Sequence, residues 1–161
     1  MSATRVTFLI FVGLSLVTAL MLSVAPLPDF MQAARPLWLA LMLSYWVFEL
    51  PYNFKISLAW VFGLAQDVLY GTYFGFHALF LAFVVYAILS FQQRLRMFPQ
   101  WQQAIFLMLI YSIGQIFLLW LNTLAGHHTL VSQYIFPALV SGLLWPWVYM
   151  IMHLLRKLMQ L

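Results

Sequence analysis

Acid–base chemistry in this chain would have to draw on very few side chains. The 161 residues include only three carboxylates, Asp29, Glu49 and Asp67. Asp67 alone falls deep inside a long apolar stretch, whereas an aspartyl mechanism needs two carboxylates that share a proton. Cysteine is absent, which excludes disulfides, thiolate catalysis and zinc-thiolate or iron–sulfur sites. The scarcity of carboxylates therefore argues against an aspartyl mechanism, and the lack of cysteine excludes a thiol-dependent enzyme.

Other patterns that carry chemistry are equally scarce. Ser112 and Ser141 each have a glycine nearby, but neither lies in a Gly-x-Ser-x-Gly elbow. His127 and His128 are adjacent, so they project in different directions, and no carboxylate lies close in sequence to complete a metal site. No Gly-x-Gly-x-x-Gly or P-loop pattern occurs. We expect no enzyme, metal or cofactor and, with a formal charge of only +4, no nucleic-acid partner.

Asp67 requires compensation, because an aspartate at the centre of a membrane helix costs about 2.5–3.5 kcal/mol. Gly63, Asp67 and Gly71 recur at positions i, i+4 and i+8, so on a helix they share a stripe that another backbone can approach closely. The spacing favours a packed role for Asp67, as a polar lock between helices or as a ligand or proton site. The alternative is an aspartate near the membrane interface, hydrated through a turn at Gly71 and Gly75.

Small and amide side chains recur at helical spacing elsewhere. Gln115 and Asn122 are seven residues apart and share one helix face. Two ridges of small residues are present: Gly71, Gly75, Ala78 and Ala82, and Ser15, Ala19 and Ser23. Ridges of this kind more often pack against other helices of the same protein than against a partner.

A proline interrupts the last apolar stretch. Pro146 has no N–H to donate to the carbonyl of Gly142, so we expect a kink there. Trp145 and Trp147 flank the proline and either anchor an aromatic belt or line a groove beside the bend. Trp46 and Trp101 also lie near the ends of predicted spans and fit such a belt.

The elements that position these residues are predicted to be membrane helices. The chain is 66% hydrophobic and 6% charged, with a mean hydropathy of +0.99, which excludes a soluble globular domain. We expect one domain, residues 1–161, that is an all-α integral membrane bundle of six transmembrane helices. The first stretch could be a cleaved signal peptide, but it exceeds the usual ~7–15 apolar residues, so a retained anchor is favoured. The predicted spans cover residues 6–24, 37–50, 56–70, 74–91, 103–124 and 132–155.

The basic residues predict the orientation of this bundle. Six spans place both termini on one side, and only Arg35 falls on the other side. The remaining basic residues lie on the terminal side: Arg5, Lys55, Arg94, Arg96, Arg156 and Lys157. Because positive charge accumulates on cytoplasmic loops, both termini are predicted to be cytoplasmic.

Several short motifs occur in a fixed order between about Pro26 and Arg156. The motifs are Arg35-Pro36-x-Trp38, Tyr45-Trp46 with Pro51, Gly63-x-x-x-Asp67-x-x-x-Gly71-x-x-x-Gly75, Trp101-Gln102-Gln103-Ala104 and Gly142-x-x-Trp145-Pro146-Trp147. In this order and spacing they resemble the rod shape-determining MreD family of Gram-negative bacteria.

The resemblance implies a multi-pass protein of the bacterial inner membrane that works in the cell-elongation complex. Its implied partners are the single-span protein MreC, the filament protein MreB, the glycosyltransferase RodA and a transpeptidase. The resemblance also implies a six-helix fold similar to the S components of energy-coupling-factor vitamin transporters.

The leading hypothesis is a non-enzymatic scaffold that binds the transmembrane helix of an MreC-like protein. The alternative is a small-molecule carrier or substrate-binding membrane subunit, for which the intramembrane polar candidates are Asp67, Gln115 and Asn122. We expect the partner helix to bind a groove formed by the Gly63–Gly75 region and the kinked last span. The candidate interface residues are Gly63, Asp67, Gly71, Gly75, Gly142, Trp145, Pro146 and Trp147.

Overall fold

A computed structural model describes residues 3–26, 28, 34–49, 52–126 and 130–158. This part of the chain is all-helical, as the sequence predicts. Four of its helices, α1, α5, α6 and α7, are long and apolar enough to span a membrane, while α3 and α4 are shorter apolar helices. The described helices are α1 (Ala3–Val24), α3 (Trp38–Glu49), α4 (Tyr52–Tyr70), α5 (Phe76–Leu95), α6 (Gln100–Leu124) and α7 (Ser132–Leu158).

Glycine and proline set several of the helix ends. Gly71, Gly75 and Gly126 all have positive φ angles, a backbone region that glycine adopts without strain. Pro99 precedes the first turn of α6, where its missing N–H has no helical partner to lose. These residues begin α5 at Phe76 rather than at the predicted residue 74, and α6 at Gln100 rather than at 103.

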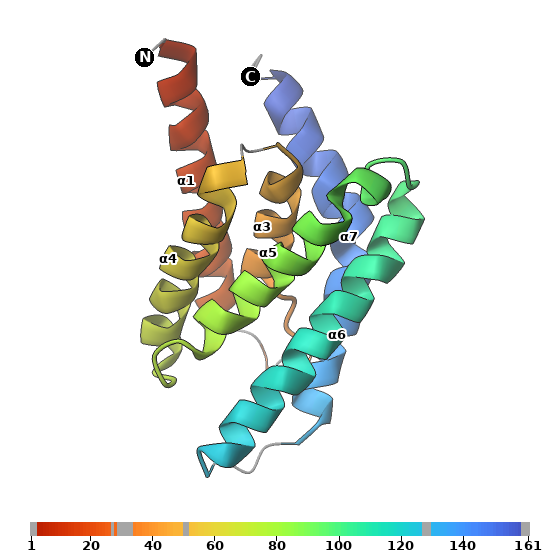
Figure 1. Ribbon diagram of the computed structural model, residues 1–161. Helices are drawn as coiled ribbons and strands as arrows, with labels where there is room; N and C mark the ends of the chain where they lie inside the picture. The colour runs from red at the N-terminus through yellow and green to blue at the C-terminus, as the bar shows by residue number, and fades with distance from the viewer. Residues whose placement is uncertain (1–2, 27, 29–33, 50–51, 127–129, 159–161) are drawn as a thin grey trace.

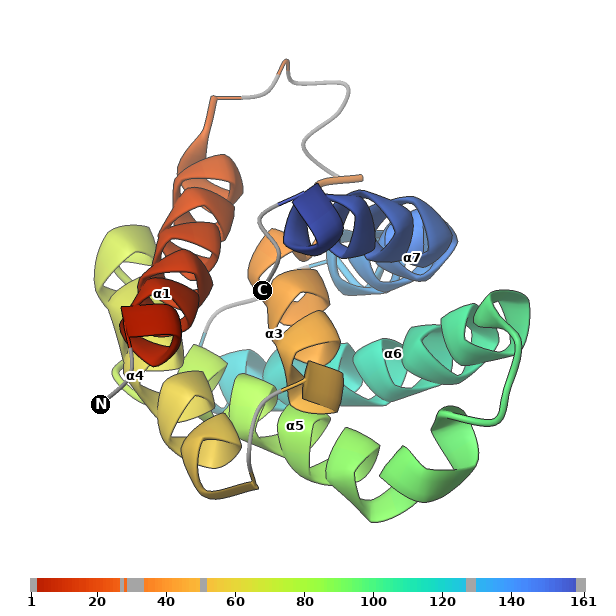
Figure 2. The same ribbon diagram turned by 90° about the horizontal axis from the view of Figure 1, so that it is seen from above.

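The short helix α3 lies at the centre of the bundle, and the other helices surround it (Figure 2). Within residues 39–48 every side chain except Met42 is buried. Helix α3 packs against α1, α4, α5 and α7, while α6 packs on α5 and α7. The start of α1 and the end of α7 lie at the same end of the bundle (Figure 1). Which side of a membrane this end faces stays a prediction.

Two tryptophans that the sequence analysis assigned to an aromatic belt belong instead to the core. Trp46 is buried, and its Nε1 donates to Ser15 Oγ at 2.8 Å. Trp145 is also buried and donates from Nε1 to Gln103 Oε1 at 3.3 Å. The belt assignment was wrong for both because each indole N–H finds an acceptor inside the bundle. Trp101 and Trp147, by contrast, are exposed.

Polar side chains cap the ends of helices where backbone carbonyls lack helical partners. Arg96 donates to the carbonyl oxygen of Phe48, and Gln92 Nε2 donates to that of Val47 at 3.3 Å, so both cap the end of α3. Gln103 Nε2 caps the end of α5 with bonds to Leu95 O at 2.9 Å and Phe98 O at 3.1 Å. A helix as short as α3 is thereby closed by its neighbours rather than by solvent.

Candidate functional site

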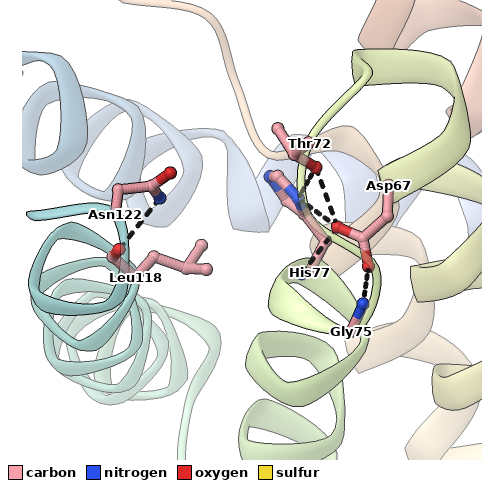
Figure 3. Close-up of polar contacts among 6 residues, drawn as sticks. All are labelled: Asp67, Thr72, Gly75, His77, Leu118 and Asn122. Carbon is pink, nitrogen blue, oxygen red and sulfur yellow. Dashed lines mark hydrogen bonds and ion pairs between the residues drawn. The ribbon is translucent and has the colours of Figure 1, made fainter. Parts of the chain in front are cut away.

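The carboxylate of Asp67 organises the connection between α4 and α5. It lies in the last turn of α4 and is fully buried. Its Oδ1 accepts bonds from Thr72 Oγ1 at 3.0 Å and from the backbone N–H of His77 at 2.9 Å, while Oδ2 accepts from Gly75 N at 2.8 Å (Figure 3). The backbone donors are orphan N–H groups at the start of α5, where a negative charge is favourable. Asp67 therefore joins the end of one helix to the beginning of the next.

His77 completes this cluster with its ring. Nδ1 lies 2.8 Å from Asp67 Oδ1. An ionised carboxylate only accepts hydrogen bonds, so Nδ1 carries the proton and donates it to Asp67. The ring also makes an edge contact with Tyr70, with centroids 5.2 Å apart. This pairing leaves Nε2 as the ring nitrogen that can meet a ligand.

The glycines around Asp67 have two different roles. A Cβ added to Gly63 would collide with the backbone of Ala78, lying 2.8 Å from its nitrogen, so α4 and α5 touch closely at this point. Gly71 and Gly75 instead lie in the turn after α4, with φ angles of 64° and 98°. The predicted helical stripe through Gly63, Asp67 and Gly71 is wrong at its last member, because α4 ends at Tyr70 before that glycine. The ridge from Gly71 to Ala82 fails for the same reason.

The candidate residues of the last span divide between the core and the surface. Helix α7 continues from Ser132 to Leu158 through Pro137 and Pro146. Gly142 faces α6, where an added Cβ would lie 2.6 Å from Met108 Cβ. Trp145, three residues after Gly142, is also buried, whereas Trp147 is exposed. The structure therefore does not bring these residues together with the Gly63–Gly75 region as one surface.

Arg35 closes the end of α1 through its guanidinium group. Nη1 donates to Ser23 O at 2.7 Å, and Nη2 donates to Ala25 O at 2.8 Å. Tyr70 donates to the same Ser23 carbonyl at 2.9 Å. A cation at a helix C-terminus is favourable because carbonyl dipoles point toward it. This first residue of the Arg35-Pro36-x-Trp38 motif is thus a cap, and Trp38 begins α3.

A polar cavity of about 540 Å³ lies at the end of the bundle opposite the start of α1, where Arg35, His77 and the α4–α5 turn meet. Residues from or beside all six described helices line it. Among the predicted residues, Arg35, Pro36 and Gln115 are brought together there, but Asn122 is not among the lining residues. Asn122 instead donates to Leu118 O at 3.0 Å, away from the Asp67 cluster (Figure 3). The Gln115 and Asn122 face is therefore split between two environments.

Sequence reasoning missed several polar residues that line this cavity. A signal was present for Thr72, which lies between Gly71 and Gly75, and for His77, which follows Gly75 by two residues at the start of α5. Gln66, Tyr70 and Tyr134 gave no signal, because their neighbours come from distant parts of the chain. The missed lining residues are Gln66, Tyr70, Thr72, His77, Gln133 and Tyr134.

The geometry offers no support for nucleophilic or metal chemistry within the described ranges. Ser141 Oγ donates to Pro137 O at 2.6 Å and accepts from Leu37 N at 2.7 Å. Ser112 Oγ donates to Met108 O at 2.8 Å. No group of three or more potential metal ligands occurs among the residues that the structure describes. His127 and His128 lie outside them, as do the side chains of Asp29 and Glu49.

Comparison with known proteins identifies the chain's relatives. The family model described as "rod shape-determining protein MreD" matches residues 3–155. A rod shape-determining protein MreD from Haemophilus influenzae (strain ATCC 51907 / DSM 11121 / KW20 / Rd) is 35% identical over 146 residues, which cover 90% of each chain. No solved structure gives a significant match, so the similarity to vitamin-transporter S components stays a prediction. On the family match and the identity across nearly the whole chain, the protein belongs to the rod shape-determining protein MreD family.

Proposed function

We propose that this chain is a non-enzymatic inner-membrane scaffold of the bacterial cell-elongation complex. Membership of the MreD family supports a role in rod shape determination. Four helices apolar enough to span a membrane, in a chain of that family, indicate a multi-pass membrane protein. The finer proposal is that the protein holds the transmembrane helix of an MreC-like partner and so positions MreB, RodA and a transpeptidase.

The observation that carries the scaffold role is how the chain uses its polar groups. Asp67, Arg35, Arg96 and Gln103 each cap the end of a helix, so these polar side chains are used to hold the helices of the bundle in place. The outer faces of the long helices carry many exposed large apolar side chains. Such a molecule presents rigid helix faces to lipid and to other helices.

The partner-binding face is proposed to include the exposed stripe of α7 around Trp147. Three of the predicted interface residues make their contacts inside the bundle, so they do not touch a partner directly: Gly63, Gly142 and Trp145. Leu143, Trp147 and Met150 are exposed and spaced three or four residues apart, so they share one helix face. Helices in lipid gain no hydrophobic free energy by associating, so they depend on close van der Waals packing. The large side chain of Trp147 offers the most surface on this face for packing against a partner helix.

Site-specific photocrosslinking in the native host tests this proposal. One crosslinking residue is placed on each of four faces, replacing Trp147 on α7, Phe74 in the α4–α5 turn, Leu14 on α1 or Ile113 on α6. All four side chains are exposed, so the panel samples the faces evenly. We expect a bitopic MreC-like protein to be captured from position 147.

The four positions also act as controls for one another. Capture of the partner from position 14 alone would place the interface on α1 and overturn the α7 assignment. Recovery of no bitopic protein from any position, together with a retained vitamin-sized ligand in the purified protein, would instead favour the carrier function.

A further inference from the structure

We propose that the cavity opposite the termini binds a small polar ligand through a phosphate or carboxylate group. The cavity lies within the ~300–1,000 Å³ range of small-molecule sites. Its lining combines a cation, amides, hydroxyls and a ring nitrogen from separate helices, as a ligand site requires. The inference does not depend on which partner helix the protein binds.

Two buried amides point to a missing partner. Gln66 is 6% exposed and Gln115 is 5% exposed, and both line the cavity. Neither amide forms a hydrogen bond with any described part of the chain, although Gln103, equally buried, forms three. Both amides instead line the cavity, where a ligand can bond to them.

The charge on the cavity wall favours an anion. Arg35 lines the cavity and uses two of the five N–H donors of its guanidinium group on the carbonyls of Ser23 and Ala25. Within the described ranges, no carboxylate pairs with it. Asp67 is fully buried and is not among the lining residues, since His77 and Thr72 stand between it and the space. The guanidinium group is therefore the charge that a ligand would meet first, and it matches phosphate and carboxylate geometry.

The neighbouring side chains fit the rest of such a ligand. Because Nδ1 of His77 is paired with Asp67, Nε2 is the ring nitrogen left to bond with a hydroxyl group of the ligand. Tyr134 and Gln133 lie in the first turn of α7, on the opposite wall, and can donate to the anionic group. A compact molecule with one anionic group and several hydroxyls would satisfy these positions together.

Thermal unfolding of the purified full chain in detergent tests the proposal. The probes are glycerol 3-phosphate, glycerate and short-chain phosphatidylglycerol, with glycerol and sodium chloride of matched ionic strength as controls. We expect a saturable rise in Tm with an anionic probe. A rise with glycerol 3-phosphate or glycerate would identify a soluble ligand, whereas a rise with phosphatidylglycerol alone would identify a lipid headgroup.

Gln66→Leu and Gln115→Leu are the informative variants. Because neither amide has a hydrogen-bond partner to lose among the described residues, we expect each unliganded variant to keep or raise its Tm. The apparent Kd for the probe should increase by about tenfold or more, the expected effect of losing a hydrogen bond to a charged group. Arg35→Gln should abolish the response, but it also removes the cap on α1, so the glutamine variants keep the test decisive if it fails to fold.

Asn122→Leu is the matched control, because Asn122 lies on the same helix as Gln115 and outside the cavity lining. It should respond to the probe as the unmodified chain does. Equal responses to glycerol or sodium chloride, no saturable response to any anionic probe, or an unchanged Kd in both glutamine variants would each overturn the proposal.

Discussion

Asp67 accepts hydrogen bonds from four donors that all lie between Thr72 and His77. The cost of a carboxylate inside a membrane helix predicts that Asp67 needs compensation. The spacing of Gly63, Asp67 and Gly71 favours a packed role for it. The sequence left the donors undecided, because a helical stripe and a turn at Gly71 and Gly75 place the glycines at the same sequence intervals. Only the positive φ angles of Gly71 and Gly75 distinguish the two arrangements.

The loss of stability caused by a substitution at Asp67 should increase with the number of hydrogen-bond donors that the substitution leaves unpaired. Asp67→Asn keeps one carbonyl oxygen but turns an NH₂ group toward a donor, so we expect a loss of about 1–3 kcal/mol in stability and partial function. Asp67→Leu removes every acceptor and should abolish rod-shape complementation. Thermal unfolding and the membrane level of each variant, measured beside cell shape, check this order.

Thr72→Val is the matched control, because it removes one side-chain donor and leaves the acceptors of Asp67 in place. It should be milder than either change at Asp67. Asp67→Asn could instead be as inactive as Asp67→Leu while being as stable as the unmodified chain. That result would indicate that Asp67 transfers a proton rather than caps the helix. Normal rod shape with Asp67→Leu would remove the residue from the functional set.

At the scale of elements, close helix contacts occur where glycine removes a side chain. Helices α4 and α5 meet at Gly63 and Ala78, while α6 and α7 meet at Gly142 and Met108. The small residues on α1 serve the same purpose, since Ala19, Ser15 and Ser23 are buried. The sequence analysis expected such ridges to be internal packing, and on α1 their burial is consistent with that.

Gly63→Ala should force α4 and α5 apart, because the new Cβ would strike the backbone of Ala78 rather than a movable side chain. Overpacking of this kind costs about 1–3 kcal/mol. The change should appear as a lower Tm of the purified protein. Adding Ala78→Gly should not rescue it, because the backbone atoms of residue 78 remain in place.

Gly13→Ala is the matched control within α1, since a Cβ there meets nothing within 4 Å. Alanine favours a helix over glycine by up to about 1 kcal/mol, so this variant should be as stable as the unmodified chain or slightly more so. If Gly63→Ala has the same Tm as the unmodified chain, α4 and α5 do not approach closely at Gly63 and Ala78.

Some helix ends were predictable where proline or glycine marks them locally, but α4 begins at Tyr52 rather than 56 and α5 ends at Leu95 rather than 91. The predicted second span, residues 37–50, matches α3 to within one residue at each end. The positions of the helices around α3 were not predictable, because α3 is apolar on every side and gives no preferred face. The cavity was also not predictable, since its lining depends on side chains from five helices and the connections beside them, which meet at one end of the bundle.

At the scale of the whole molecule, charge is divided between the two ends of the bundle. Arg96, Arg156 and Lys157 lie near the end that holds the start of α1, and Arg35 lies at the opposite end (Figure 1). The same division in the sequence predicts the cytoplasmic side, because basic loops are retained there. The arrangement of the bundle and the positive-inside rule together predict an orientation that one labelling experiment can test.

The absence of native cysteine makes that experiment direct. Phe74, Met97 and Leu130 are each strongly exposed and lie in connections between helices, so single substitutions to cysteine should be tolerated. In spheroplasts, an impermeant maleimide should label Phe74→Cys and Leu130→Cys, whereas Met97→Cys should react only after the membrane is opened. Labelling of Met97→Cys alone in sealed cells would reverse the orientation without changing the fold. Protection of Leu130→Cys while Phe74→Cys reacts would show that α6 does not cross the membrane, and the six-span arrangement would then be wrong.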